Sequence, residues 1–309
     1  MAPSPIKPKV TAAEAASPFN KYDSLLEIPS GKDPKQNAWL TLQLRVKLNF
    51  IDSRNPGSNA TRAADGKFYA EDADGYLYPL IDWGDFYRDK FVKQFQTHAE
   101  KVWNWQFLLV TPRDYAGLDI VQPNQLIRPN VLCLFRLCIV DSGATHSIDV
   151  VNPSFSTASV KNKDNAKPDR AVGKFDAGTF RSDSTQYDDS DLFRPYMWDP
   201  GEKIWHDTIG HEIGHAIGQA HIMGLKGDAT CDMSAATGND ARCYGTGEDS
   251  KNIMGGGDRI WLENAVSWTE RIGIHTGTPK AKWTATGVMQ TPPRTLPKAA
   301  IKPGIAPTF

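Results

Sequence analysis

Three histidines and a glutamate lie close together in the segment GHEIGHAIGQAH, residues 210–221. His211 and His215 are four residues apart, and an α-helix advances about 100° per residue. Both imidazoles therefore lie on one face of a helix, one turn apart, where they can share a single metal ion. This spacing predicts a helix at this point in the chain and a fold built around a metal centre.

A third ligand is expected from His221, because Gly218 can end the helix in a left-handed conformation at little cost. The chain can then reverse direction and return His221 toward the ion. A catalytic zinc ion has three protein ligands and keeps its fourth position for water. Glu212 follows His211 directly and can reach that position as a proton acceptor. These residues predict a zinc site with Glu212 as the general base.

The segment HEIGHAIGQAH, residues 211–221, carries the pattern HExxHxxGxxH. By this pattern the chain resembles the metzincin clan of zinc metalloproteases. The resemblance implies one catalytic zinc ion and hydrolysis of peptide bonds in a protein or peptide substrate. It gives the ligand roles to His211, His215 and His221, and the role of general base to Glu212.

The resemblance also implies a Met-turn, which is a tight turn whose methionine lies beneath the metal. The segment NIMGGG, residues 252–257, supplies Met254 for this turn, and its rival Met223 lies very close to His221 in the sequence. Some subgroups of the clan use a tyrosine two residues after that methionine as a further ligand, but this chain has Gly256 there. The pattern therefore indicates the clan without indicating a subgroup.

Hydrophobic periodicity predicts a mixed α/β (α+β) fold. Residues 37–52 alternate apolar and polar side chains, which is typical of a half-buried strand. Further strands are expected over residues 105–112, 131–141 and 147–153, with a short hairpin over residues 67–81. Helices are expected over residues 82–104, 202–218 and 258–273, the last with Asp258 as its N-cap. Together with the motif, this order predicts a metzincin-like zincin domain with a twisted mixed sheet, an active-site helix, the Met-turn and a C-terminal helix.

Two features are expected in the polar stretch between residues 154 and 200. The segment GKFDAGTFRSD, residues 173–183, is the candidate for the edge strand that would hold an extended substrate. The acidic residues of this stretch are Asp183, Asp188, Asp189 and Asp191. They lack the regular alternation and the glycine of a calcium loop, so a solvated acidic loop is favoured over a calcium site.

The four cysteines fall into two pairs. Cys133 and Cys138 lie five residues apart in one expected strand, so their side chains point to opposite faces and cannot bridge each other. They are predicted to be free thiols. Cys231 and Cys243 bracket a polar loop, and a disulfide between them is expected if the protein resides in an oxidising compartment.

Other histidines and the tryptophans are expected to be structural. His98, His146 and His275 belong to no motif. The tryptophans expected to pack in the core are Trp103, Trp105, Trp205, Trp261 and Trp268.

A single metallopeptidase domain is expected over residues 36–280. It lies between a Pro/Ala/Lys-rich segment, residues 1–35, and a Pro-rich segment, residues 281–309, which are typical either of linkers or of disordered ends. No apolar run of a classical signal peptide is visible. These features resemble bacterial effector or toxin modules. They predict a secreted or extracytoplasmic protein with non-classical export, whose partner is a larger carrier protein or an inhibitor or immunity protein.

Composition restricts the other classes of partner. The formal net charge is −1 over 309 residues, which predicts no general attraction to nucleic acid or to an anionic membrane. The longest apolar run, residues 131–140, is too short to span a bilayer.

Two alternatives to a peptidase are a zinc amidohydrolase acting on cell-wall or other non-protein amides, and a non-catalytic zinc-binding module. Structural zinc sites usually have four protein ligands, often cysteines. Three histidines beside a glutamate do not fit that type of site.

Overall fold

The computed structural model of the chain describes residues 22–28, 37–58, 60–71, 76–122, 124–153, 161–162, 186–187, 197–199, 204–205, 207–222, 224–227, 245–288 and 294–297. Several predicted features lie outside these residues: the edge strand over 173–183, the acidic residues of the 154–200 stretch, and the Cys231–Cys243 disulfide.

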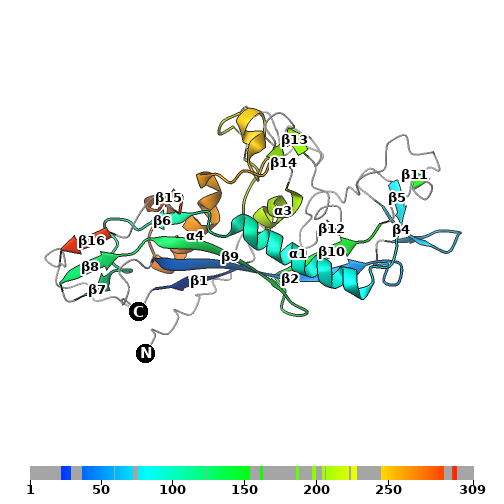
Figure 1. The fold of residues 1–309 in the computed structure, drawn as a ribbon, viewed down its shortest axis with the longest axis horizontal. Helices are drawn as coiled ribbons and strands as arrows, with labels where there is room; N and C mark the ends of the chain where they lie inside the picture. The colour runs from blue at the N-terminus through cyan, green and yellow to red at the C-terminus, as the bar shows by residue number, and fades with distance from the viewer. Residues whose placement is uncertain are drawn as a thin grey trace.

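The largest sheet of the described residues has seven strands, in the order β12-β10-β2-β9-β6-β15 with β1 also paired to β2 (Figure 1). Its strands are β1 (Asp23–Glu27), β2 (Ala38–Ile51), β6 (Leu108–Val110), β9 (Val131–Ile139), β10 (His146–Val151), β12 (Gln186–Tyr187) and β15 (Thr284–Thr286). The contacts β2–β9, β2–β10 and β10–β12 are parallel, whereas β1–β2, β6–β9 and β6–β15 are antiparallel. The sheet is therefore mixed.

The central strand β2 follows the alternation seen in its sequence. Leu40, Leu42 and Leu44 are fully buried, while Trp39 on the opposite face is 46 % exposed. A strand with one apolar face must bury that face against another layer. One hydrophobic core accordingly joins β2 to all three α-helices described below.

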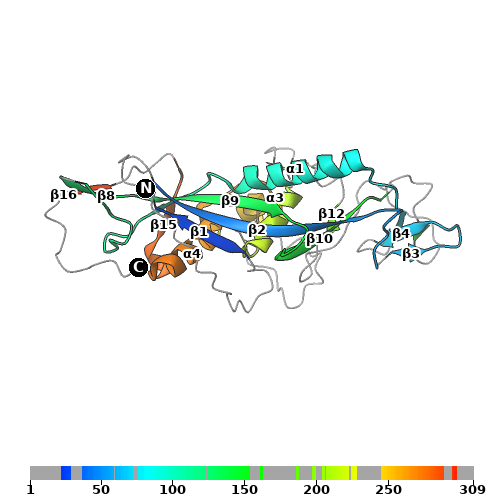
Figure 2. The same cartoon turned by 90° about the horizontal axis from the view of Figure 1, so that it is seen from below.

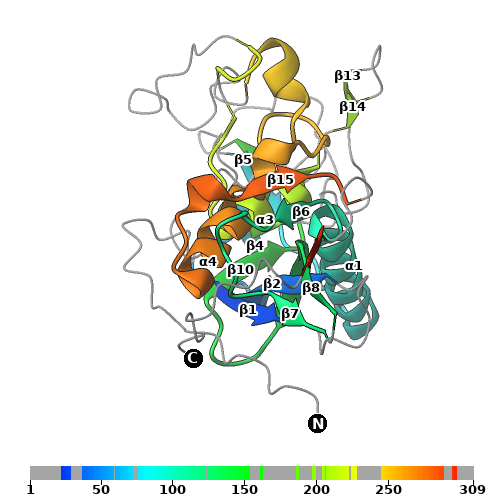
Figure 3. The same cartoon turned by 90° about the vertical axis from the view of Figure 1, so that its left-hand side faces the viewer.

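These helices are α1 (Asp85–Trp103), α3 (Thr208–Ala216) and α4 (Val266–Thr276), with 3-10 helices η2 (Gly247–Lys251), η3 (Leu262–Ala265) and η4 (Lys280–Lys282). In α1 the side chains of Phe91, Phe95, Ala99 and Trp103 recur every fourth residue and are buried. Figures 2 and 3 show α3 between α1 and α4. The indole ring of Trp268 on α4 lies 6.2 Å from that of Trp103 on α1, measured between ring centroids. No helix among the described residues combines the length and the apolar character needed to cross a membrane.

Three small sheets lie outside the main one. The first is β11 (Lys161–Asn162), β5 (Tyr76–Pro79), β4 (Phe68–Glu71) and β3 (Thr61–Arg62); the second is β16 (Arg294–Pro297), β8 (Gln125–Arg128) and β7 (Ile120–Val121); the third is β13 (Met197–Asp199) with β14 (Ile204–Trp205). Figure 1 places the first two at opposite ends of the main sheet. The antiparallel pair β4–β5 confirms the predicted hairpin.

Both predicted end segments contribute strands, which extends the paired structure beyond residues 36–280. Strand β1 lies before residue 36 and pairs with β2, and strands β15 and β16 follow residue 280. These strands are only three to five residues long. Segments this short show little periodicity, so strands within a Pro-rich stretch are hard to recognise from sequence.

The helices predicted over residues 202–218 and 258–273 both begin later than expected. The helix predicted from residue 202 begins at Thr208, because Ile204–Trp205 forms β14 and the Asp207 carboxylate caps the helix. The helix predicted from residue 258 begins at Val266, after the 3-10 turn η3. Asp258 is therefore not its N-cap.

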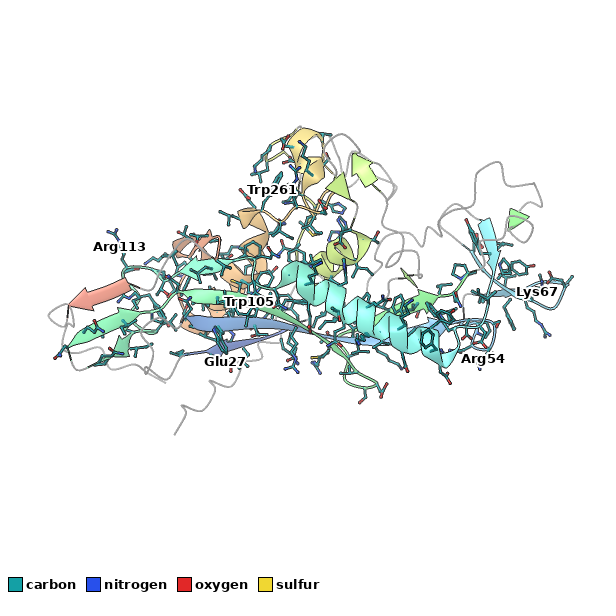
Figure 4. The ribbon with its side chains drawn as sticks, in the orientation of Figure 1. Glu27, Arg54, Lys67, Trp105, Arg113 and Trp261 are labelled. Atoms are coloured by element: carbon teal, nitrogen blue, oxygen red, sulfur yellow. The ribbon has the colours of Figure 1, made fainter. Side chains whose placement is uncertain are left out.

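The predictions for single side chains have mixed outcomes. Cys133 and Cys138 are free, as predicted. Trp103 and Trp268 are fully buried, but Trp105, labelled in Figure 4 near the end of α1, is 61 % exposed. The backbone of Trp105 has φ of 63°, a left-handed conformation between α1 and β6 that turns its side chain out of the core.

Candidate metal centre

Helix α3 begins and ends with specific capping interactions. The Asp207 carboxylate accepts a hydrogen bond from the amide of Gly210 at 2.7 Å, which satisfies one of the free donors of the first turn. At the other end Gly218 has φ of +88°. Its amide donates to the carbonyl of His215 at 2.8 Å, and the amide of Gln219 donates to that of Gly214 at 2.9 Å. This pair of bonds is a Schellman motif, which reverses the chain after a helix.

The reversal brings three imidazoles together. Nε2 of His221 lies 3.1 Å from Nε2 of His211 and 3.0 Å from Nε2 of His215. One ligand nitrogen of each histidine lies within 4.8 Å of the other two. Two nitrogens bound to a tetrahedral ion at about 2.0–2.1 Å are separated by roughly 3.3 Å. The geometry fits a shared ion, so His211, His215 and His221 could hold a metal ion.

The opposite ring nitrogens of two histidines are fixed by backbone carbonyls. Nδ1 of His211 lies 2.7 Å from the carbonyl oxygen of Ile253, and Nδ1 of His215 lies 2.8 Å from that of Gln219. A carbonyl only accepts hydrogen bonds, so each Nδ1 carries a proton, and in the neutral imidazole the lone pair then lies on Nε2. This tautomer is the one that binds a metal through Nε2.

The electrostatic environment also favours neutral imidazoles. Burial lowers the pKa of His215, despite its bond to the Gln219 carbonyl. Burial, followed by the neighbouring His215, lowers the pKa of His221 to about 4. Because metal ligation requires the neutral form of histidine, these two side chains are in the binding form at neutral pH.

A tight turn over residues 252–257 lies against the helix that carries two of these histidines. The amide of Met254 donates to the Oδ1 of Asn252 at 2.8 Å, and the amides of Gly255 and Gly257 donate to the Asn252 carbonyl. The amide of Ile222 donates to the carbonyl of Met254 at 3.1 Å. The turn is thus bonded directly to the residue that follows His221, and Met254 is fully buried.

Close packing between this turn and α3 explains Gly214. A Cβ at position 214 would lie 2.3 Å from the Sδ of Met254 and 2.9 Å from the ring of Trp103. Both distances are far shorter than van der Waals contact. Position 214 therefore needs glycine because the methionine and the indole occupy the space of a side chain.

Replacing Gly214 with alanine is expected to reduce the free energy of unfolding by about 1–3 kcal/mol, the usual cost of overpacking a core. Urea denaturation would measure the change. In a Met254→Ala background the same replacement should cost less, because the sulfur that it contacts is gone. An equal cost in both backgrounds would contradict the contact.

Glu212 follows His211 on α3 and is half-buried.

The segment after His221 is held by a different residue, a buried carboxylate that the sequence analysis did not identify. Asp249 is fully buried and accepts hydrogen bonds from the amides of Leu225, Lys226 and Gly227 at 2.7–3.0 Å. These bonds attach residues 224–227 to η2.

The ring of Trp261, labelled in Figure 4, covers the same segment. The ammonium of Lys226 lies 3.7 Å from the centre of its indole ring. The tryptophan therefore packs at the surface, over the segment that follows His221, rather than in the core.

A second residue that the sequence did not indicate is His98 on α1. Its Nε2 lies 2.9 Å from both carboxylate oxygens of Asp207, the N-cap of α3. The hydrogen bond to Asp207 raises the pKa of His98, against the effect of burial. His98 thus links α1 to the first turn of the helix that carries His211 and His215. No spacing in the sequence marks this pairing, since His98 and Asp207 lie 109 residues apart.

Comparison with known proteins gives no match: no family model, no curated protein and no solved structure is detectably similar to this chain.

Proposed function

We propose that the protein is a zinc-dependent endopeptidase that hydrolyses peptide bonds. The observation that carries this proposal is the convergence of three Nε2 atoms, two of them on imidazoles whose Nδ1 is held by a backbone carbonyl. Imidazole is a common zinc ligand, and a site with three protein ligands leaves the fourth tetrahedral position open, as catalytic zinc sites do. The HExxHxxGxxH pattern and the buried Met254 also support the metzincin resemblance.

In this proposal His211, His215 and His221 hold the ion, and Glu212 is the general base. When bound, zinc would polarise the scissile carbonyl and make a neighbouring water more acidic. The Glu212 carboxylate accepts a proton from the attacking water and delivers it to the nitrogen of the leaving amine. Placing the base next to a ligand on the same rigid helix fixes its position without extra ordering on substrate binding.

The proposal is tested by metal analysis of the purified chain together with an unbiased peptide-library cleavage profile. We expect zinc in stoichiometric amount, cleavage that a chelator abolishes, and recovery when zinc is returned. Peptidoglycan fragments are assayed in parallel. Hydrolysis of those fragments without peptide cleavage would replace the peptidase by an amidohydrolase. Bound zinc without any hydrolysis would favour a non-catalytic module.

A further inference from the structure

The side chain of Gln219 lies in the interior beside the C-terminal end of α3 and is only 5 % exposed. A buried amide is costly unless its polar atoms find partners. The Nε2 of Gln219 donates to the carbonyl of Asn264 at 3.0 Å and to the hydroxyl of Ser267 at 2.6 Å. Both acceptors belong to the η3–α4 segment, so Gln219 attaches the end of α3 to the start of the last helix.

The backbone of Gln219 is connected to the metal centre at the same time. Its amide donates to the carbonyl of Gly214, and its carbonyl accepts the Nδ1–H of His215 at 2.8 Å. The side chain and the carbonyl of one residue are therefore fixed together. The bonds to α4 hold in place the oxygen that orients the second histidine.

Ser267 extends the connection back to α3. Its hydroxyl, which accepts from Gln219, donates to the carbonyl of Ile217 at 2.6 Å. That carbonyl belongs to the last turn of the helix region, where carbonyls have no partner within the helix. Ser267 is 1 % exposed, so water does not compete for these bonds.

Asn264 joins the same network to the turn beneath the site. Its Oδ1 accepts from the Nδ2 of Asn252 at 2.8 Å, and the Oδ1 of Asn252 accepts from the amide of Met254. The neighbouring carbonyl of Ile253 accepts the Nδ1–H of His211. One buried polar network therefore reaches the carbonyl partners of both histidines on α3.

We infer that Gln219 is a positioning residue of the metal centre, which orients His215 through its own carbonyl while its side chain is anchored to Asn264 and Ser267. This inference rests on the proposed zinc site. Partners that orient metal-bound histidines typically contribute about 10- to 100-fold to metal affinity. Gln219→Met keeps an unbranched chain of similar length but removes both donated hydrogen bonds, and it should weaken zinc binding by about that factor.

The test measures the zinc dissociation constant of the full chain by competition with a chromophoric chelator. It also records the visible spectrum of the Co²⁺-loaded protein, which reports the geometry of the ligand set. We expect weaker zinc binding and altered Co²⁺ bands in Gln219→Met, and smaller changes of the same kind in Ser267→Ala. In the double variant the two effects should be less than additive, because both remove the same hydrogen bond.

Gln96→Met is the matched control. Gln96 on α1 also donates from Nε2 to a carbonyl, that of Leu137, at 2.8 Å, but it is not connected to the site. It should lower stability without changing zinc affinity or the Co²⁺ bands. If wild-type protein binds zinc and Gln219→Met binds it equally well with unchanged bands, the inference is wrong. If wild-type protein does not bind zinc, the proposed function itself fails.

Discussion

Replacement of His215 by alanine is expected to weaken zinc binding by at least roughly 10³-fold. Structural zinc sites in zinc-finger peptides have apparent binding free energies of about 10–16 kcal/mol, and an equal share for one of three ligands would be about 4 kcal/mol. The imidazole is held on both sides, by Nε2 near His221 and by Nδ1 on the Gln219 carbonyl. Among the described residues the group that could hold a metal consists of His211, His215 and His221, so the variant keeps two of its three nitrogens.

Equilibrium dialysis against zinc, followed by metal analysis, would measure the loss. His275→Gln serves as the control, because His275 on α4 is bonded to Ser24 at 2.9 Å and does not belong to the three-histidine group. It should keep wild-type zinc affinity. Circular dichroism would show whether the His215→Ala chain remains folded. Full zinc occupancy in a folded His215→Ala protein would rule out the ligand assignment and with it the proposed function.

Local patterns were sufficient for the parts of the fold whose residues are neighbours in sequence. The alternation of residues 37–52 predicts β2, and the four-residue spacing of Phe91, Phe95 and Ala99 predicts α1. The grouping of the three histidines could also be predicted from residues that are close in sequence. A helix turn and one left-handed glycine bring them together, and both can be derived from spacing alone.

The start of α3 shows where local patterns fail. Residues 202–218 continue an apolar spacing through Ile204 and Trp205, which predicts one long helix. The structure instead pairs those two residues with β13 and begins the helix after Asp207. Pairing with β13, which lies only a few residues earlier in the chain, overrides helix propensity here, and the helix begins after the capping carboxylate of Asp207.

The contacts that hold the metal centre in place could not be predicted from the sequence, for a different reason. His98 and Asp207 are 109 residues apart, and Gln219 and Ser267 are 48 apart. Neither pair has a characteristic spacing. The need for glycine at position 214 likewise depends on where Met254 packs. Contacts of this kind follow from the tertiary arrangement of α1, α3 and α4, which periodicity does not specify.

Replacement of Glu212 by glutamine should separate metal binding from chemistry. The amide has nearly the same shape as the carboxylate but cannot accept a proton from water. We expect zinc affinity and stability to stay close to those of the wild type, because the three converging nitrogens belong to other residues. The rate of peptide hydrolysis should fall by about 10²–10⁴-fold, the usual contribution of a general base.

The measurement is kcat/KM on the best peptide from the library, with zinc content determined on the same samples. Glu263→Gln, an exposed glutamate on η3, is the matched control and should leave the rate unchanged. The hydrolysis rate and the zinc content together distinguish a proton acceptor from a metal ligand at position 212. Loss of zinc together with loss of hydrolysis would make Glu212 part of the metal site rather than a base. Unchanged hydrolysis with zinc retained would show that another group accepts the proton, while the three-histidine centre would still stand.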